Sequence, residues 1–334
     1  MYNIREQFEE NERNTLSKYA QLACNTKGRE KPQEKCDFRT EYQRDRDRII
    51  HSKSFRRLKH KTQVFITPQG DHYRTRLTHT LEVSQIARTI ARALCLNEDL
   101  TEAMSLGHDL GHTPFGHRGE DALDALCKGG FRHYEQSLRV VDVLENGTGL
   151  NLTYEVRDGI RNHTGKNVPS TLEGKVLKYA DKFAYINHDI DDAIRGGVIC
   201  EGDLPKELIK ILGEKHSQRI NTMICDTVIN SLNKNDIVMS DEIGQAMLAL
   251  RQFMFDTVYE NPIKREEERK ATYIIGEMFE HFTKKPELLP DEYKQFIGDY
   301  EVDRVVCDYI AGMSDDYAVD TFKSIFVPKS WTVF

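Results

Sequence analysis

The amino-acid sequence predicts an all-α protein. Apolar residues recur at helical spacing through most of the chain, and no series of alternating strands interrupts them. Glycine and proline divide the chain into segments of ordinary helical length. With 334 residues, of which 39% are hydrophobic, the chain can bury a large core.

The N-terminal part is polar and opens with a helix that we expect to reach about Ala23. A loop marked by Gly28 follows, and residues 43–60 form a second predicted helix of mixed charge. Residues 64–67, ahead of a Pro-Gln-Gly turn, are the best candidate for a short extended piece.

Beyond this point the helical period is clear. One predicted helix carries an apolar stripe formed by Leu81, Val83, Ile86, Ala87, Ile90, Ala91 and Leu94. Further helices are predicted over residues 99–108, 119–126, 133–144 and 154–163.

A long helix is predicted to begin at Ser170, because Glu173 three residues later would complete a capping box. It should end near residues 196–197, where the clearest break of the chain begins. The remainder is helical in pattern, with stops at three prolines. We therefore expect an N-terminal segment (1–40), a catalytic core (41–200) and a C-terminal helical region that packs on the core (201–334).

Charge is distributed unevenly along the chain. The formal net charge is -7, yet residues 39–61 hold nine basic against three acidic side chains. Arg44 to Arg48 alternates in sign, which is typical of a solvated helix face. The lysines and arginines at residues 56–61 suit a phosphate-binding site instead. Composition alone does not decide between these interpretations.

Cellular location is predicted from what the sequence lacks. The seven cysteines include no C-x-x-C pair, and their spacing suits neither a zinc ribbon nor a disulfide framework. The first residues are polar, unlike a signal peptide, and no apolar run is long enough for a bilayer. We therefore expect a cytoplasmic protein with no membrane contact.

Three histidines lie close together at His108, His112 and His117, interrupted by two glycines and a proline. A lone histidine on an apolar helix is more often a buried structural residue. Here the bends allow several side chains to converge, and His108 is followed directly by Asp109. Imidazole and carboxylate ligands suit a divalent cation. We expect Mn2+ or Mg2+ first, with iron, cobalt, nickel or zinc as alternatives.

The remaining ligands must come from other helices, for which His79 and Asp181 are the candidates. With them, the chain resembles the HD-domain phosphohydrolases and, more closely, the deoxyguanosine triphosphate triphosphohydrolase family. The resemblance rests on six ordered blocks at residues 54–65, 76–83, 108–117, 133–137, 180–189 and 308–313. It implies that His79, His108, Asp109 and Asp181 hold the metal.

The same resemblance implies roles for other residues. His117 and Glu120 match the family's catalytic pair, and His112 belongs to the predicted catalytic set as a phosphate contact. His133 is a further phosphate contact. Whether His117 acts as acid, base or nucleophile stays open.

Substrate contacts are implied on the long helix. Lys182 would bind phosphate, and Tyr185 and Asp189 would bind the sugar; an ordinary core tyrosine is the alternative for Tyr185. Arg57 and Arg76 would complete the cationic surface that a triphosphate requires.

The predicted function is hydrolysis of deoxynucleoside triphosphates, dGTP or several of them, to deoxynucleoside and inorganic triphosphate. One alternative is an HD-domain enzyme that acts on monophosphates or on a cyclic or signalling nucleotide. The other is a binder of single-stranded nucleic acid through residues 39–61, whose affinity would fall steeply with salt. The family also implies a homo-oligomer, commonly a hexamer, and effector binding by deoxynucleoside triphosphates or nucleic acid.

Overall fold

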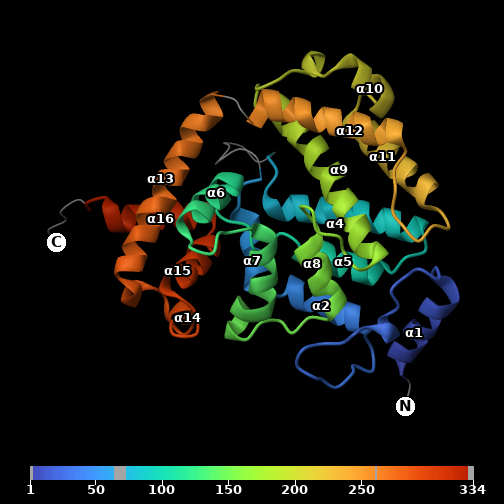
Figure 1. Cartoon of the computed structure of the whole chain (residues 1–334), viewed down its shortest axis with the longest axis horizontal. Coiled ribbons are helices and arrows are strands. Elements are labelled where there is room, and N and C mark those ends of the chain that lie inside the picture. Colours follow the sequence, from blue (N-terminus) through green and yellow to red (C-terminus); the bar gives the residue numbers. More distant parts are fainter. Residues whose placement is uncertain (1–2, 64–72, 260–261, 330–334) are drawn as a thin grey trace, which may run out of the picture.

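The computed structural model describes residues 3–63, 73–259 and 262–329, and within them it is helical throughout, with no strand (Figure 1). The predicted extended piece at residues 64–67 lies outside the described residues. The first eight α-helices are α1 (Ile4–Thr15), α2 (Glu41–Ile50), α3 (Lys53–Arg57), α4 (Arg76–Ala93), α5 (Glu98–Gly107), α6 (Gly116–Leu126), α7 (His133–Arg139) and α8 (Tyr154–Asn162). The others are α9 (Leu172–Arg195), α10 (Lys206–Leu212), α11 (His216–Ser231), α12 (Asp241–Met254), α13 (Pro262–Lys284), α14 (Asp291–Lys294), α15 (Val302–Ala311) and α16 (Asp315–Phe326).

The larger hydrophobic core forms around α4, α5 and α9. Most of the predicted stripe of α4 is buried there, including Ile86 and Ile90. Leu81 was wrongly assigned to it, because this side chain is 49% exposed, and Leu94 is only partly buried. Helix α8 packs closely on α5 at Gly159. A Cβ at this position would lie 1.9 Å from the sulfur of Met104, so the approach requires glycine. Burial of these apolar stripes is the main source of the helices' stability.

A second hydrophobic core joins α6 to the C-terminal helices. Leu123 of α6 is buried together with Ile275 of α13 and Val306 and Ile310 of α15. Figure 1 shows α13 to α16 gathered on one side of the molecule, with α1 on the opposite side. The helix that carries His117 and Glu120 therefore rests on the C-terminal region.

Two predicted helix boundaries near the N-terminus are wrong. The first helix ends at Thr15, well short of Ala23. The predicted helix over 43–60 is broken after Ile50, where the Ser52 side chain caps α3. The Glu145 carboxylate also accepts hydrogen bonds from the backbone at the start of α3, so a residue distant in sequence fixes this break.

The predicted capping box at Ser170 is also wrong. The side chain of Thr171 caps α9 instead, by accepting a hydrogen bond from the Gly174 amide. Glu173 is buried and accepts hydrogen bonds of 3.0 Å from the amides of Gln21 and Asn97. Glu173 therefore binds the backbone of two other segments instead of capping the start of α9.

No described helix combines the length and the apolar character needed to cross a bilayer. The predicted boundaries at residues 40 and 200 stay predictions.

Candidate active site

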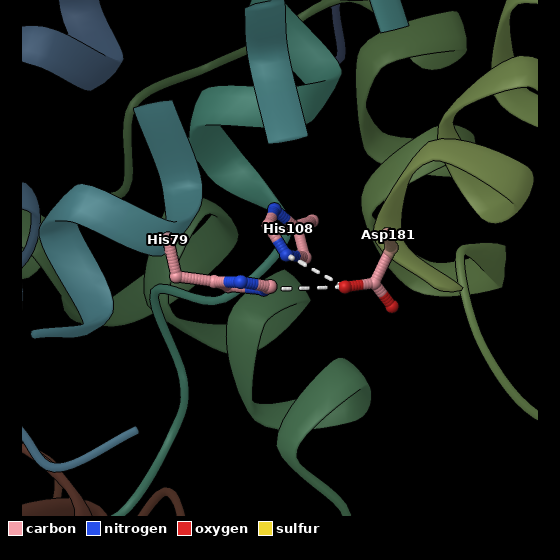
Figure 2. Close-up of side chains that lie close together, drawn as sticks. All are labelled: His79, His108 and Asp181. Atoms are coloured by element: carbon pink, nitrogen blue, oxygen red, sulfur yellow. Dashed lines mark hydrogen bonds and ion pairs between the residues drawn. The ribbon is translucent and has the colours of Figure 1, made fainter. Parts of the chain in front are cut away.

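The four predicted metal ligands converge in the larger core. His79 lies on α4, His108 and Asp109 follow α5, and Asp181 lies on α9. The Nε2 atom of His79 is 3.3 Å from Oδ1 of Asp181, and His108 Nε2 is 3.8 Å from the same oxygen (Figure 2). Asp109 Oδ1 is 3.5 Å from His108 Nε2. Two ligands about 2.1 Å from one ion, at ordinary coordination angles, would be roughly 3.0–3.5 Å apart.

The hydrogen bonding of His108 supports a cation at this place. Its Nδ1 donates to the Ser105 carbonyl over 2.6 Å, which leaves Nε2 as the nitrogen available to a metal. That Nε2 atom is buried, makes no hydrogen bond, and lies 3.5 Å from Asp109 and 3.8 Å from Asp181. A buried nitrogen without a hydrogen bond is unfavourable, and a cation held jointly with the two carboxylates would satisfy it. The residues present therefore fit a divalent metal, and the Ser105 bond is the support expected for a metal-binding imidazole.

A further histidine, not predicted from the sequence, joins this cluster. His163 follows α8, donates from Nδ1 to the Ile160 carbonyl, and directs Nε2 to within 4.0 Å of Asp109 Oδ1. Burial lowers the pKa of His163 to about 4, so the ring is neutral near pH 7. A single histidine at a helix end carries no distinctive sequence signal.

Arg76 supports this cluster directly. Its guanidinium is buried, donates to Asp109 over 2.7 Å and donates from Nε to the Thr62 carbonyl over 3.3 Å. The side chain also lines the adjoining cavity. Arg76 therefore orients a predicted metal ligand as well as facing the space predicted for phosphate.

A tight turn before α6 places His117. Phe115 has φ 62° and Gly116 has φ 60°, so two consecutive residues adopt the left-handed conformation that bulky side chains rarely occupy. The Thr113 hydroxyl donates to the Gly116 carbonyl across this turn. His117 follows as the second residue of α6, with its ring 5.7 Å from that of His112.

Glu120 has a partner that the sequence did not predict. Its carboxylate accepts from the His133 amide over 3.0 Å and lies 2.8 Å from His133 Nδ1. Burial acts to lower the pKa of His133, but the hydrogen bond and charge of Glu120 outweigh it and raise this pKa. The His133 ring stacks on that of His112 at 4.3 Å. Glu120 thus favours the protonated form of the His133 imidazole beside the cluster.

A cavity of about 420 Å³ adjoins the metal ligands. Its lining includes the predicted residues His79, Asp109, His112, His117, His133, Asp181, Tyr185, Asp189 and Arg76. Residues after 200 also contribute, namely Arg251, Phe255, Tyr259 and Glu268, none of which was predicted. The Tyr259 hydroxyl donates to the Asp189 carboxylate. Their sequence surroundings contain no glycine or histidine pattern that would distinguish them.

Two predicted substrate contacts are not brought to this cavity. Arg57 lines a second cavity of about 350 Å³, together with Gln136, Tyr293 and Asp308. Lys182 is half-buried on α9, with its ammonium 6.0 Å from the Tyr179 ring, and is not part of the lining. Turning by one residue along a helix rotates a side chain by about 100°, which separates Lys182 from Asp181.

The basic segment 39–61 is largely engaged within the fold. Arg46 pairs with Asp99 and Glu102, and Arg44 pairs with Glu41. Lys61 is buried and donates to the carbonyl of Ala311. These pairings support the interpretation of a structural surface for the alternating stretch.

Comparisons with known proteins agree with this arrangement. A model of the HD domain matches residues 76–186, and one of the phosphohydrolase-associated domain matches residues 237–324. A crystallised phosphohydrolase from Bacteroides thetaiotaomicron superposes with a TM-score of 0.51 at 18% identity, over 83% of this chain and 67% of that one. The latter likeness concerns the fold alone. The fold, the site and the matching HD-domain model together assign this chain to the HD-domain phosphohydrolases.

Curated relatives narrow the class further. Deoxyguanosinetriphosphate triphosphohydrolase-like proteins of Caldanaerobacter subterraneus subsp. tengcongensis and Clostridium perfringens are 59% and 51% identical to this chain, which is covered to 98% in both alignments. The alignments cover 97% and 98% of those proteins. A relative from Geobacter sulfurreducens is 40% identical over 95% of this chain and 96% of its own length. The chain belongs to the family of deoxyguanosinetriphosphate triphosphohydrolase-like proteins. The predicted family and the all-α fold are thereby confirmed.

Proposed function

We propose that this phosphohydrolase cleaves deoxynucleoside triphosphates to deoxynucleoside and inorganic triphosphate, with Mn2+ or Mg2+ as the cation. The observation that carries the proposal is a single cavity in which the His79, His108 and Asp181 cluster adjoins Tyr185 and Asp189. In this proposal the phosphates lie at the cluster and the sugar lies beside Tyr185 and Asp189. The printed names of the relatives support dGTP as the first substrate to test.

The phosphate end must hold a substrate with several negative charges. Arg76, His133 and Arg251 supply cationic groups around the same cavity. The His112 ring is buried, lies 5.7 Å from the His117 ring and stacks on the His133 ring. Burial lowers the pKa of His112. It can therefore act as a neutral donor to a phosphate oxygen. The bound cation would polarise the α-phosphate toward attack by water.

His117 is assigned to the leaving group in this proposal. When the bond from the α-phosphorus to the 5′-oxygen breaks, that oxygen needs a proton. His117 directly follows the turn that begins α6, lines the cavity and lies beside His112. We assign it as the acid that protonates the 5′-oxygen, while Glu120 acts through His133.

In this proposal the sugar end of the cavity favours deoxyribose over ribose. Asp189 can accept a hydrogen bond from a 3′-hydroxyl, in competition with the Tyr259 hydroxyl that occupies it here. Tyr185 lies one helical turn from Asp189 on α9 and limits the space beside the sugar. A site of this kind penalises analogues that clash or leave the carboxylate unpaired.

The test is product identification. The pure chain is incubated with each deoxynucleoside triphosphate and Mn2+, and the products are separated and identified by mass spectrometry. Deoxynucleoside with intact triphosphate is the expected result, and release of orthophosphate or pyrophosphate contradicts it. Turnover of monophosphates or cyclic nucleotides alone would favour the alternative HD chemistry.

A further inference from the structure

A buried carboxylate of the C-terminal region reaches the active-site turn. Asp315 is the first residue of α16 and is 6% exposed. Its Oδ1 accepts a hydrogen bond of 3.0 Å from the amide of Phe115. Its Oδ2 accepts a hydrogen bond of 3.0 Å from the amide of Thr62 and another from the Thr62 hydroxyl. One side chain therefore joins three segments that are far apart in the sequence.

The first of these bonds acts on the turn that places His117. The Phe115 backbone is left-handed, with φ 62°, and such a conformation persists only where the surroundings hold it. Asp315 fixes the amide of this residue from outside the turn. Because α6 begins at Gly116, the direction in which His117 leaves the turn depends on this contact.

The other two bonds act on the support of Asp109. Asp315 holds Thr62, the Thr62 carbonyl accepts from Nε of Arg76, and Arg76 pairs with Asp109 over 2.7 Å. Lys61 adds a parallel connection, because its ammonium donates to the carbonyls of both His112 and Ala311. Residues 311–315, which connect α15 to α16, are thus hydrogen-bonded both to the turn before His117 and to the segment that supports Asp109.

We propose that Asp315 is a positioning residue, which holds the His117 side chain at a fixed position relative to the predicted metal ligand Asp109. Asp315 does not line the cavity, and it acts through Phe115 on one side and through Thr62 and Arg76 on the other. The assignment of His117 to the reaction rests on the proposed function. The contacts of Asp315 themselves do not.

The experiment compares Asp315→Asn with the matched control Asp316→Asn. Asp316 is the next residue of the same helix, and its side chain is 72% exposed. An asparagine at 315 presents one acceptor and one amino group, so it cannot accept from both amides and the hydroxyl. We expect kcat of Asp315→Asn to fall about 30- to 100-fold, as misplacement of a reacting group does. KM and the metal content of the folded protein should stay near the parent values, whereas the melting temperature should fall by about a few degrees, because a buried charge-assisted hydrogen bond is lost. Asp316→Asn should match the parent throughout.

A measurement independent of turnover accompanies the kinetics. Hydrogen exchange of the peptide spanning residues 113–120 should be faster in Asp315→Asn than in the parent and in Asp316→Asn. Thr62→Val, which removes only the hydroxyl donor, should lower kcat in the same direction by a smaller factor. In the double variant the two effects should be less than additive, because both act through one carboxylate.

The positioning role is overturned if Asp315→Asn keeps its kcat within about twofold of the parent, against the 30- to 100-fold loss expected from misplacement. It is equally overturned if kcat falls only in proportion to lost metal or lost folded protein, or if exchange at residues 113–120 is unchanged. A parent chain that does not turn over deoxynucleoside triphosphates would refute the proposed function. The exchange comparison would still decide the role of Asp315.

Discussion

Replacement of Glu120 by glutamine separates the charge of this residue from its shape. The carboxylate now accepts from both the amide and Nδ1 of His133. A glutamine can accept only one of these bonds, and its amino group must face the other. Loss of one charge-assisted hydrogen bond costs about 1.5–3 kcal/mol, which corresponds to roughly a 10- to 150-fold change in an equilibrium or rate.

The same substitution changes the protonation of His133. Burial and the charge of Arg76 lower the pKa of this imidazole, and without Glu120 they are opposed only by Asp109. In the variant the ring should be neutral at pH 7.5 and become charged only at lower pH. We therefore expect kcat/KM of Glu120→Gln to be about 10- to 100-fold below the parent at pH 7.5, with the deficit shrinking as pH falls.

The assay is kcat/KM for dGTP with Mn2+ between pH 5.5 and 9, with metal content measured on the same samples. Glu135→Gln is the matched control, because Glu135 lies on α7 near His133 but pairs at the surface with Arg161 over 3.0 Å. The control should follow the parent profile. A pH-independent deficit in Glu120→Gln, or a loss of metal that accounts for it, would refute the reasoning.

Three further predictions address the metal, the sugar and the fold. Asp109→Ala should lose bound metal and activity together, whereas His117→Ala should keep its metal and lose turnover; elemental analysis beside a rate assay checks this, and full activity in either variant contradicts the site. Tyr185→Ala should reduce the discrimination between deoxyribonucleoside and ribonucleoside triphosphates about tenfold or more, measured as a ratio of kcat/KM values, and an unchanged ratio would remove its role at the sugar. Burial raises the pKa of Glu12 to about 7 from 4.5, so the folded chain retains a proton that the unfolded chain releases between these values, and stability falls as pH rises through that window. Glu12→Gln should therefore stabilise the fold by about 1–2 kcal/mol at pH 8, allowing for partial exposure, and not at pH 4.5; equal melting temperatures of parent and variant at pH 8 would contradict this.

The helical fold could be predicted because it depends on local pattern, whereas the approach of His79 and Asp181 to His108 was expected only from the family resemblance. The apolar residues of α4 recur in consecutive helical turns. The pair His108 and Asp109, followed by a glycine, indicates a helix end. By contrast, the break of the predicted helix over 43–60 depends on Glu145, which lies far along the chain. A pattern within one segment cannot show a cap that another segment provides.

The missing site residues share this property. His163 reaches the cavity from the end of α8, and Arg251 and Tyr259 reach it from α12 and the π-helical turn that continues it. Each is a single residue without a neighbouring motif. Asp315 acts on Phe115 across 200 residues of sequence. Conversely, Arg57 lies in a block that resembles the family yet lines another cavity, together with Gly111 and Tyr293. Tertiary packing, rather than sequence spacing, decides these positions.

Hydrolysis of dGTP in 18O-labelled water, with Mn2+ and the intact chain, tests the central claim most directly. Attack on the α-phosphorus with departure of the 5′-oxygen predicts one labelled oxygen in the released triphosphate and none in the deoxyguanosine. Label in the nucleoside, or deoxyguanosine monophosphate with pyrophosphate as products, would contradict the account.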